Sequence, residues 1–235
     1  MRLDRLLSAL SVCTRSQCRK MLGSVTVNGQ RPRSADTDVK EEDVILVRGE
    51  SLDTRLSRCL IMNKPAGVLT AAEDSRSRTV MDLLPPVYRS LECMPVGRLD
   101  KDTTGVLLFT TDGQLAHRLI SPKNEVAKVY TAQVDGVLDE SDIRAFREGI
   151  PFRDFTALPA QLEILSPDTG RVTVYEGKYH QVKRMFQSRG KPVLALRRES
   201  FGPFAAGDSL PEGAYRELDR EECRLLYRTA GMEMK

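Results

Sequence analysis

The sequence predicts an α+β fold, in which a small N-terminal unit of helices and strands precedes a larger domain built on a β-sheet. Leucines near the N-terminus recur at helical spacing, whereas short apolar runs typical of strands are scattered through the rest of the chain. These runs do not alternate with helices in the regular rhythm that builds a parallel sheet. Forty per cent of the 235 residues are apolar, which is enough for a folded core.

The N-terminal unit begins with two predicted helices. Leucines follow a helical period from Leu3 to Leu10, and a second helix is expected between a cap at Thr14 or Ser16 and Gly23. Two strands separated by an Asn-Gly turn are expected next, and then a polar linker; the strands lie at residues 25–27 and 44–47, and the linker at residues 48–58.

The larger domain is expected to intersperse short strands with helices. The predicted strands are residues 60–63, 106–110, 130–134, 162–165 and 172–175. The predicted helices are residues 80–84, 114–120, 139–148 and 180–188. Pro85 and Pro86 are expected to stop the first of these helices.

Basic residues are concentrated in two stretches, although the net charge of the whole chain is only +3. Residues 1–33 contain seven Lys or Arg against Asp4 alone, and residues 178–198 contain seven with no acidic residue. Such stretches are either solvated faces or surfaces that bind a polyanion, and charge alone does not decide between them.

Several classes of protein lack support in the sequence. No apolar run reaches the roughly 18 residues that would indicate a membrane span, and the N-terminus lacks the apolar segment of a signal peptide. Five scattered cysteines without a C-x-x-C pair, together with only two histidines, favour a reducing cytoplasm and argue against a metal site. Motifs of nucleotide-binding proteins and serine hydrolases are absent from the sequence.

One loop combines the residues best suited to chemistry. Residues 97–105 include Arg98, Asp100 and Asp102 and come directly before the apolar strand at 106–110. A nearby cation favours the ionised form of a carboxylate, and an ionised, oriented carboxylate can act as a nucleophile or as a base. On composition alone, a capped turn is the more ordinary explanation of this loop.

Four segments together resemble the motifs of pseudouridine synthases, which isomerise uridine in RNA. The segment G-R-L-D-K-D-T-T-G-V-L-L-F resembles the family's signature loop, and Lys128-Val129-Tyr130 resembles its K-x-Y motif. The segments N-K-P-A-G, starting at Asn63, and E-G-K-Y-H-Q-V-K-R-M, starting at Glu176, resemble the motif that opens the catalytic domain and the third motif. Four motifs in this order are far more specific than any one of them.

The first 48 residues resemble the S4 RNA-binding domain, through R-L-D-R-L-L, S-Q-C-R-K and V-T-V-N-G-Q. The resemblance implies an S4-like RNA-binding domain at residues 1–52, a linker at 53–58 and a catalytic domain at 59–235. In this family the catalytic domain is a mixed, mostly antiparallel sheet with helices around a central cleft. We expect no cofactor and no metal, and we expect a monomer.

The resemblance also implies a substrate. Y-H-Q-V-K-R-M-F and the closing G-A-Y-R-E-L favour the branch that modifies the small ribosomal subunit, at uridine 516 of 16S rRNA. The partner is then 16S rRNA itself or a small-subunit assembly intermediate. A uridine of 23S rRNA is the alternative.

Three catalytic residues follow from the resemblance. Asp100 matches the family's catalytic aspartate, Tyr130 matches its active-site tyrosine, and Lys183 falls where many members carry an arginine paired with the aspartate. Either Lys183 or Arg184 faces Asp100, and the register favours Lys183. Breaking the C1′–N1 bond builds positive charge at C1′, which a carboxylate stabilises whether it attacks C1′ or takes the 2′ proton.

One carboxylate is enough for this reaction. Hydrolytic glycosidases generally need two, because they activate a water molecule, whereas isomerisation adds no water. Asp102 is therefore expected to be structural, and His180 is expected to be a structural hydrogen-bonding residue.

RNA contacts are expected in three places. On the second helix of the S4-like domain, Arg15, Arg19 and Lys20 are expected to contact phosphates, which position a protein without reading sequence. Arg98 is expected to fill the place that a flipped-out nucleotide leaves. Backbone contacts near the site are expected from Arg184, Arg197 and Arg198.

Three other functions are compatible with parts of the sequence. A non-catalytic RNA-binding protein of the same fold has no need of Asp100, Tyr130 and Lys183 together. A magnesium-dependent nuclease or phosphotransferase would use Asp100 and Asp102 as ligands. A hydrolytic glycosylase would release free uracil.

Overall fold

The computed structural model describes residues 1–207 and 209–234 and confirms the α+β fold class. The chain forms two compact units, each with a buried apolar core of its own. The first unit contains residues 1–58 and 84–93, and the second contains residues 59–83 and the chain from residue 94 onward.

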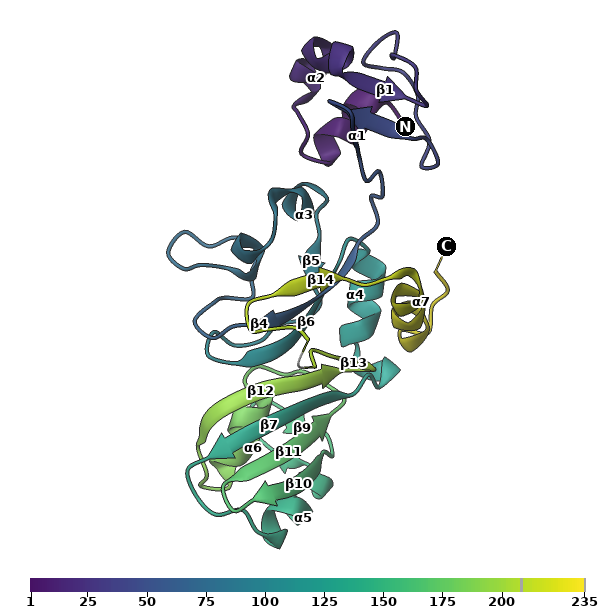
Figure 1. The fold of residues 1–235 in the computed structure, drawn as a ribbon. Coiled ribbons are helices and arrows are strands. Elements are labelled where there is room, and N and C mark those ends of the chain that lie inside the picture. Colours follow the sequence, from purple (N-terminus) through teal and green to yellow (C-terminus); the bar gives the residue numbers. More distant parts are fainter. Residues whose placement is uncertain (208, 235) are drawn as a thin grey trace. The chain divides into compact units, whose positions relative to one another are not determined.

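The first unit packs short helices against a small antiparallel sheet (Figure 1). Its helices are α1 (Leu3–Ala9), α2 (Arg15–Met21), a 3₁₀ helix (Leu22–Ser24) and α3 (Pro86–Ser90). Its strands, in sheet order, are β1 (Val25–Val27), β2 (Ile45–Val47) and β3 (Glu50–Ser51). Thr14 caps α2 and exchanges hydrogen bonds with Gln17, which satisfies backbone N–H groups at the helix start. The segment expected to be irregular after residue 48 contains β3, because Glu50 and Ser51 pair with β2.

The helical segment before Pro85 and Pro86 ends there, as predicted, but Pro86 also begins a second helix, which the sequence did not indicate. Residues 80–83 form only a 3₁₀ turn, and α3 begins at Pro86. A proline loses no hydrogen bond in the first turn of a helix, and its fixed φ suits a helix start. Val87 and Leu91, on and just after α3, then pack against the core of the first unit.

The second unit is built on a mixed, mostly antiparallel sheet, as the resemblance implies. Its longer strands are β4 (Cys59–Lys64), β6 (Thr104–Thr110), β7 (Lys128–Val134), β10 (Gln161–Ser166), β11 (Thr169–Val174) and β12 (Val193–Phe201). Its short strands are β5 (Met94–Pro95), β8 (Ile150–Pro151), β9 (Thr156–Ala157), β13 (Phe204–Ala205) and β14 (Tyr215–Glu217). The main sheet has the order β10-β11-β7-β12-β6-β4-β14, and within the described residues β12 and β6 are its one parallel pair.

Helices and 3₁₀ helices lie between these strands, and one helix, α7, follows the last strand (Figure 1). They are a 3₁₀ helix (Val80–Leu83), α4 (Gly113–Ile120), a 3₁₀ helix (Pro122–Asn124), α5 (Glu140–Glu148), α6 (Gln181–Ser188) and α7 (Arg220–Thr229). The helices predicted at 114–120, 139–148 and 180–188 agree with α4, α5 and α6 to within one residue at each end.

The centre of the sheet brings distant parts of the sequence into register. Gly105 on β6 pairs with Arg198 on β12, which pairs in turn with Tyr130 on β7. Gly105 has φ +103°, and a Cβ atom there would lie 2.1 Å from the carbonyl oxygen of Arg198. Only glycine allows this close approach of β6 and β12. The loop that precedes β6 is thereby separated from Tyr130 on β7 by the single strand β12.

Candidate active site

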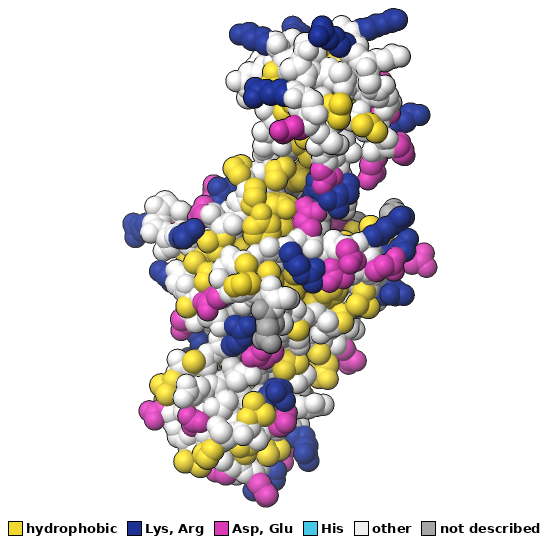
Figure 2. Space-filling view, in the orientation of Figure 1, with side chains coloured by type: hydrophobic (Ala, Val, Ile, Leu, Met, Phe, Trp, Pro, Cys, Tyr) yellow, Lys and Arg dark blue, Asp and Glu magenta, His cyan; other side chains and the backbone are white. Residues whose placement is uncertain are grey.

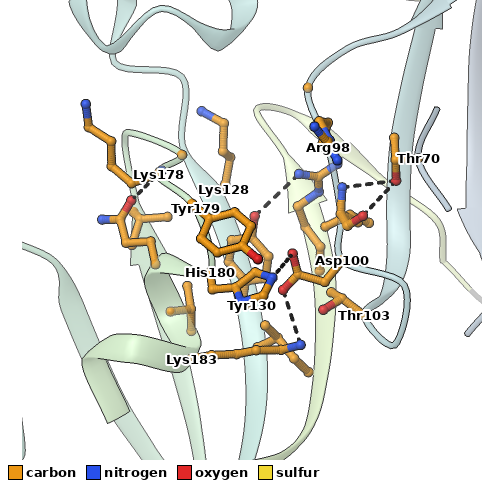
Figure 3. Close-up of a pocket in the computed structure, with 18 of the residues that line it drawn as sticks. Thr70, Arg98, Asp100, Thr103, Lys128, Tyr130, Lys178, Tyr179, His180 and Lys183 are labelled. Atoms are coloured by element: carbon orange, nitrogen blue, oxygen red, sulfur yellow. Dashed lines mark hydrogen bonds and ion pairs between the residues drawn. The ribbon is translucent and has the colours of Figure 1, made fainter. Parts of the chain in front are cut away.

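A cavity of about 630 Å³ lies in the second unit beside the centre of its main sheet (Figure 3). Its lining includes the three residues expected to be catalytic, Asp100, Tyr130 and Lys183, although they are far apart in the sequence. Asp100 comes from the loop before β6, Tyr130 from β7 and Lys183 from α6. Concave sites lined by apolar surface with a few converging polar groups are where ligands usually bind.

Hydrogen bonds from two buried side chains hold the loop that carries Asp100 in place. Lys64, at the end of β4, is fully buried, and its Nζ donates to the carbonyl oxygens of Thr103 at 2.9 Å and of Lys101 at 3.3 Å. The Thr70 hydroxyl donates to the Leu99 carbonyl oxygen at 2.8 Å. Carbonyl oxygens on both sides of Asp100 are therefore occupied, which fixes the backbone from which the carboxylate projects.

Asp100 lies between two basic side chains. Its Oδ2 is 3.2 Å from Lys183 Nζ, and its Oδ1 is 3.3 Å from His180 Nε2 (Figure 3). The Asp100 side chain keeps 26% of its exposure, so it is paired and still open to the cavity. Arg184 points elsewhere: it pairs with Asp154, and its guanidinium lies 4.6 Å from the centre of the Phe152 ring. In this structure Lys183, and not Arg184, faces Asp100.

Lys183 also binds Asp102, with its Nζ 2.5 Å from Asp102 Oδ1. Burial lowers the pKa of Lys183, but its hydrogen bonds to Asp102 and Asp100 outweigh burial and raise the pKa above the usual value for lysine. The hydrogen bond from Lys183 lowers the pKa of Asp102. An ammonium group thus occupies the position between the two carboxylates that a bridging magnesium ion would need. Among residues 1–207 and 209–234, no cluster of three His, Cys, Asp or Glu side chains has the arrangement of a metal site.

Tyr130 is supported from inside the sheet by Arg198. The tyrosine is 8% exposed, and Arg198 Nη1 donates to its hydroxyl oxygen at 3.4 Å. Arg198 Nε donates to the Val106 carbonyl oxygen at 2.6 Å. Arg198 is itself only 2% exposed, so the prediction that it contacts the RNA backbone from the surface is wrong. Arg198 is buried because β12 lies between β7 and β6, and because Gly105 allows β6 to approach β12 closely at this residue.

The other residues expected to bind RNA lie at three separate positions. Arg98 is exposed and lines the cavity. Arg197 is partly exposed, with its Nη1 3.4 Å from Asn63 Oδ1. In the first unit, the exposed basic residues of α2 are Arg15, Arg19 and Lys20. Figure 2 shows several Lys and Arg side chains projecting from that unit.

Three polar residues at the site are buried or contact the Asp100 loop, which the sequence did not indicate; they are Lys64, Lys128 and His180. Lys64 lies in the N-K-P-A-G motif, but its spacing from Asp100 gives no sign that it binds the carbonyl groups of that loop. Burial lowers its pKa to about 8. Lys128 opens the K-x-Y motif and is 4% exposed, and burial likewise lowers its pKa to about 8. His180, expected to have a structural role, contacts Asp100 directly.

Comparison with known proteins agrees with this geometry. The family model for RNA pseudouridylate synthase matches residues 58–188, and the model for the S4 domain matches residues 1–45. The chain belongs to the RNA pseudouridylate synthase family. It is therefore an isomerase that acts on RNA, with an N-terminal S4 domain, as the sequence predicts.

Similar proteins align with almost the whole length of this synthase. An uncharacterized RNA pseudouridine synthase of Bacillus subtilis is 42% identical over 96% of this chain and 98% of its own length. The ribosomal small subunit pseudouridine synthase A of Pseudomonas aeruginosa is 39% identical over 94% of this chain and 98% of its own length. A crystal structure of a pseudouridylate synthase aligns with a TM-score of 0.68 and 35% identity, over 96% of this chain and 99% of that one. None of the described helices of the synthase is both long enough and apolar enough to cross a membrane.

Proposed function

We propose that this synthase converts uridine 516 of 16S rRNA to pseudouridine, with Asp100 as the catalytic carboxylate. The observation that carries the proposal is the position of Asp100, in contact with Lys183 and His180 and open to a cavity that Tyr130 also lines. The relatives named ribosomal small subunit pseudouridine synthase A, in Pseudomonas aeruginosa and Vibrio cholerae, match over at least 94% of this chain and support the small-subunit target.

The reaction requires one carboxylate positioned beside C1′ of the target uridine. The C1′–N1 bond breaks, the uracil turns within the cavity, and C5 bonds to C1′. C5 then loses its proton and N1 gains one, which gives an isomer of the substrate. Asp100 stabilises the positive charge that develops at C1′, by attack on C1′ or by taking the 2′ proton. Lys183 contacts Asp100 and holds its carboxylate in place through a charge-assisted contact.

Tyr130 is proposed to hold the uracil through its ring. The ring borders the cavity, and the bond from Arg198 fixes the hydroxyl end of the side chain. A ring fixed in this way can stack on the base before and after it turns. Arg98, exposed at the same cavity, is proposed to occupy the stack from which the uridine has left.

RNA binding outside the cavity is assigned to both units. Residues 1–52 are proposed as the RNA-binding domain, 53–58 as a linker and 59–235 as the catalytic domain. Arg15, Arg19 and Lys20 are proposed to contact phosphates from α2. Arg184 and Arg197 are proposed to contact the RNA backbone near the cavity.

The enzyme is proposed to act as a monomer in the cytoplasm. Its substrate is proposed to be 16S rRNA or a small-subunit assembly intermediate.

The test is to map pseudouridines in rRNA from a strain that lacks this protein, using carbodiimide adducts and primer extension. The proposal predicts that the signal at uridine 516 disappears and that all other sites remain. The wild-type gene should restore the signal, and the Asp100→Asn variant, produced at the same level, should not. A missing signal in 23S rRNA instead, or an unchanged map, would contradict the proposed target.

A further inference from the structure

Tyr179 presents an exposed aromatic ring at the mouth of the active-site cavity. It is 76% exposed and lines the cavity (Figure 3). A single exposed apolar side chain needs no explanation by itself. Tyr179 differs from such a side chain because both its ring and its loop are held in place by specific contacts.

The ring of Tyr179 stacks on the imidazole of His180. The ring centres are 3.8 Å apart, and the planes differ by 18°. His180 has φ +51°, a left-handed conformation that is uncommon for residues other than glycine and that turns its side chain toward Asp100. One face of Tyr179 is thus covered by a ring that contacts the proposed catalytic carboxylate, and its exposed fraction leaves the other face open.

The loop that carries Tyr179 is braced by two buried polar side chains. Gln181 Nε2 donates to Glu176 Oε1 at 2.8 Å, and the backbone N–H of Lys178 donates to Gln181 Oε1 at 3.0 Å. The N–H of Leu158 donates to the same Glu176 oxygen at 2.8 Å. Glu176 is 3% exposed and Gln181 5% exposed. A satisfied polar network in the interior rigidifies the chain around it, so Tyr179 is held at the cavity mouth.

We propose that Tyr179 is a stacking platform for the nucleobase next to the target uridine. When a uridine leaves its stack, the neighbouring base loses a stacking partner, and an open aromatic face beside the cavity can replace that partner. Stacking on an aromatic side chain accepts any base, because every base has a π face. This inference rests on the proposed function, since it requires the uridine to enter the cavity that contains Asp100.

The first test measures steady-state kinetics for two substitutions at position 179. Tyr179→Leu keeps an apolar side chain but removes the ring, and it should raise KM about 5- to 100-fold with little change in kcat. Tyr179→Phe keeps the ring and should stay within about twofold of wild type. The substrate is 16S rRNA or the small-subunit particle, whichever the wild-type enzyme modifies. An unchanged KM for Tyr179→Leu, or an equal loss in both variants, would overturn the proposal.

Salt dependence separates stacking from phosphate binding. The ratio of the KM of Tyr179→Leu to that of wild type should stay constant between about 50 and 200 mM salt, because stacking releases no counterions. Lys178→Gln, on the exposed neighbouring residue, is the matched control and should reduce the dependence of KM on salt. A ratio for Tyr179→Leu that falls with salt as it does for Lys178→Gln would count against a stacking role.

A direct optical test is available because the chain contains no tryptophan. Tyr179→Trp introduces a single reporter, whose emission should be strongly quenched on titration with 16S rRNA as a base stacks on it. Leu165→Trp, on β10 and outside the cavity lining, is the control and should change little. Equal changes at both positions would contradict the platform. Wild-type enzyme that forms no pseudouridine in 16S rRNA would contradict the proposed function instead, and the titration would still report on stacking.

Discussion

Two aspartates of the second unit each bind two basic side chains, yet their surroundings differ. Asp142, on α5, is fully buried, with Arg189 Nε 3.1 Å from its Oδ1 and Lys191 bound to its Oδ2. It also accepts the N–H of Asp139 at the start of α5. Asp100 has Lys183 and His180 at similar distances, but its carboxylate lies on a loop and opens to the cavity.

The comparison shows that basic partners alone do not identify a reactive carboxylate. Around Asp142, burial raises the pKa, but hydrogen bonds from Lys191, the Asp139 backbone and Arg189 outweigh it and the net pKa is lowered. These bonds occupy Asp142 from within the fold, so it stabilises the start of α5. Asp100 has a comparable set of partners and also an open side. We propose that access to a ligand distinguishes Asp100, as the catalytic carboxylate, from the structural Asp142.

The largest effect is expected from Asp100→Asn. Removing the charge while keeping the shape should lower kcat at least about 1000-fold, as loss of a central catalytic group commonly does. Thermal unfolding should barely change, because the side chain is partly exposed and Lys183 keeps Asp102 as a partner. Single-turnover pseudouridine formation and calorimetry measure the two quantities. A large loss of stability with retained activity would reverse the roles assigned to the two aspartates.

Asp142→Asn should show the opposite pattern. Breaking a buried ion pair by removing one partner costs roughly 3–5 kcal/mol, which corresponds to a Tm lower by roughly 6–20 °C for a protein of this size. Activity per folded molecule should remain within about twofold of wild type, because Asp142 does not line the cavity. Activity measured below the transition temperature and corrected for folded fraction tests this prediction. A kcat loss as large as that of Asp100→Asn would break the comparison.

A smaller effect should separate Lys183 from its neighbour Arg184. Lys183→Gln removes the cation that contacts Asp100 and should lower kcat about 10- to 100-fold, the size expected for loss of a charge-assisted contact. Arg184→Gln is the matched control: it removes a cation that pairs with Asp154 and lies against Phe152, and it should change kcat less than about threefold. Comparable kcat losses in both variants would mean that kcat depends on the total positive charge of α6 and not on the contact between Lys183 and Asp100.

The smallest effect concerns pH and Lys64. At pH 7 the Lys64 ammonium is charged and binds the carbonyl oxygens of the Asp100 loop, but above its pKa of about 8 it loses a proton and a donor. Lys64→Met should therefore lower kcat about 10-fold at pH 7, the value of one lost buried hydrogen bond. The deficit relative to wild type should shrink as pH rises from 7 to 9.

This pH effect is not loss of the fold. The folded pKa of Lys64 lies below the usual 10.5 because burial disfavours the charged form. Between about pH 8 and 10.5 the unfolded chain binds more protons at this group, so its contribution to stability becomes more favourable as pH rises. Calorimetry at pH 7 and 9 is the control. A kcat ratio that is constant from pH 7 to 9 would show that the Lys64 charge does not position the loop.

Much of the fold and site was accessible from the sequence because local patterns agreed with tertiary structure. The apolar run at 106–110 is the core of β6, and the register of 180–188 correctly favoured Lys183 over Arg184 as the residue that faces Asp100. The sequence also predicted the cap of the second helix at Thr14 or Ser16, because a cap depends on residues within one turn, and the structure shows Thr14 in that position.

What the sequence could not show depends on contacts between distant segments. Arg198 has the sequence pattern of a surface cation. It is buried because β12 lies between β7 and β6, and because Gly105 lets β6 approach the backbone of Arg198 closely. His180 reaches Asp100 through a left-handed backbone conformation that no periodicity predicts. Pro86 starts a helix where a proline pair suggested a stop, because the position of a proline within the turn decides its effect.

The most direct measurement is a crystal structure of the Asp100→Asn variant bound to a 16S rRNA fragment that contains its target uridine. We expect a uridine turned out of its stack into the cavity, with C1′ beside residue 100 and the base against the ring of Tyr130. A uridine that remains stacked in the RNA, or one bound with its sugar away from residue 100, would contradict the assignment of Asp100 as the catalytic carboxylate.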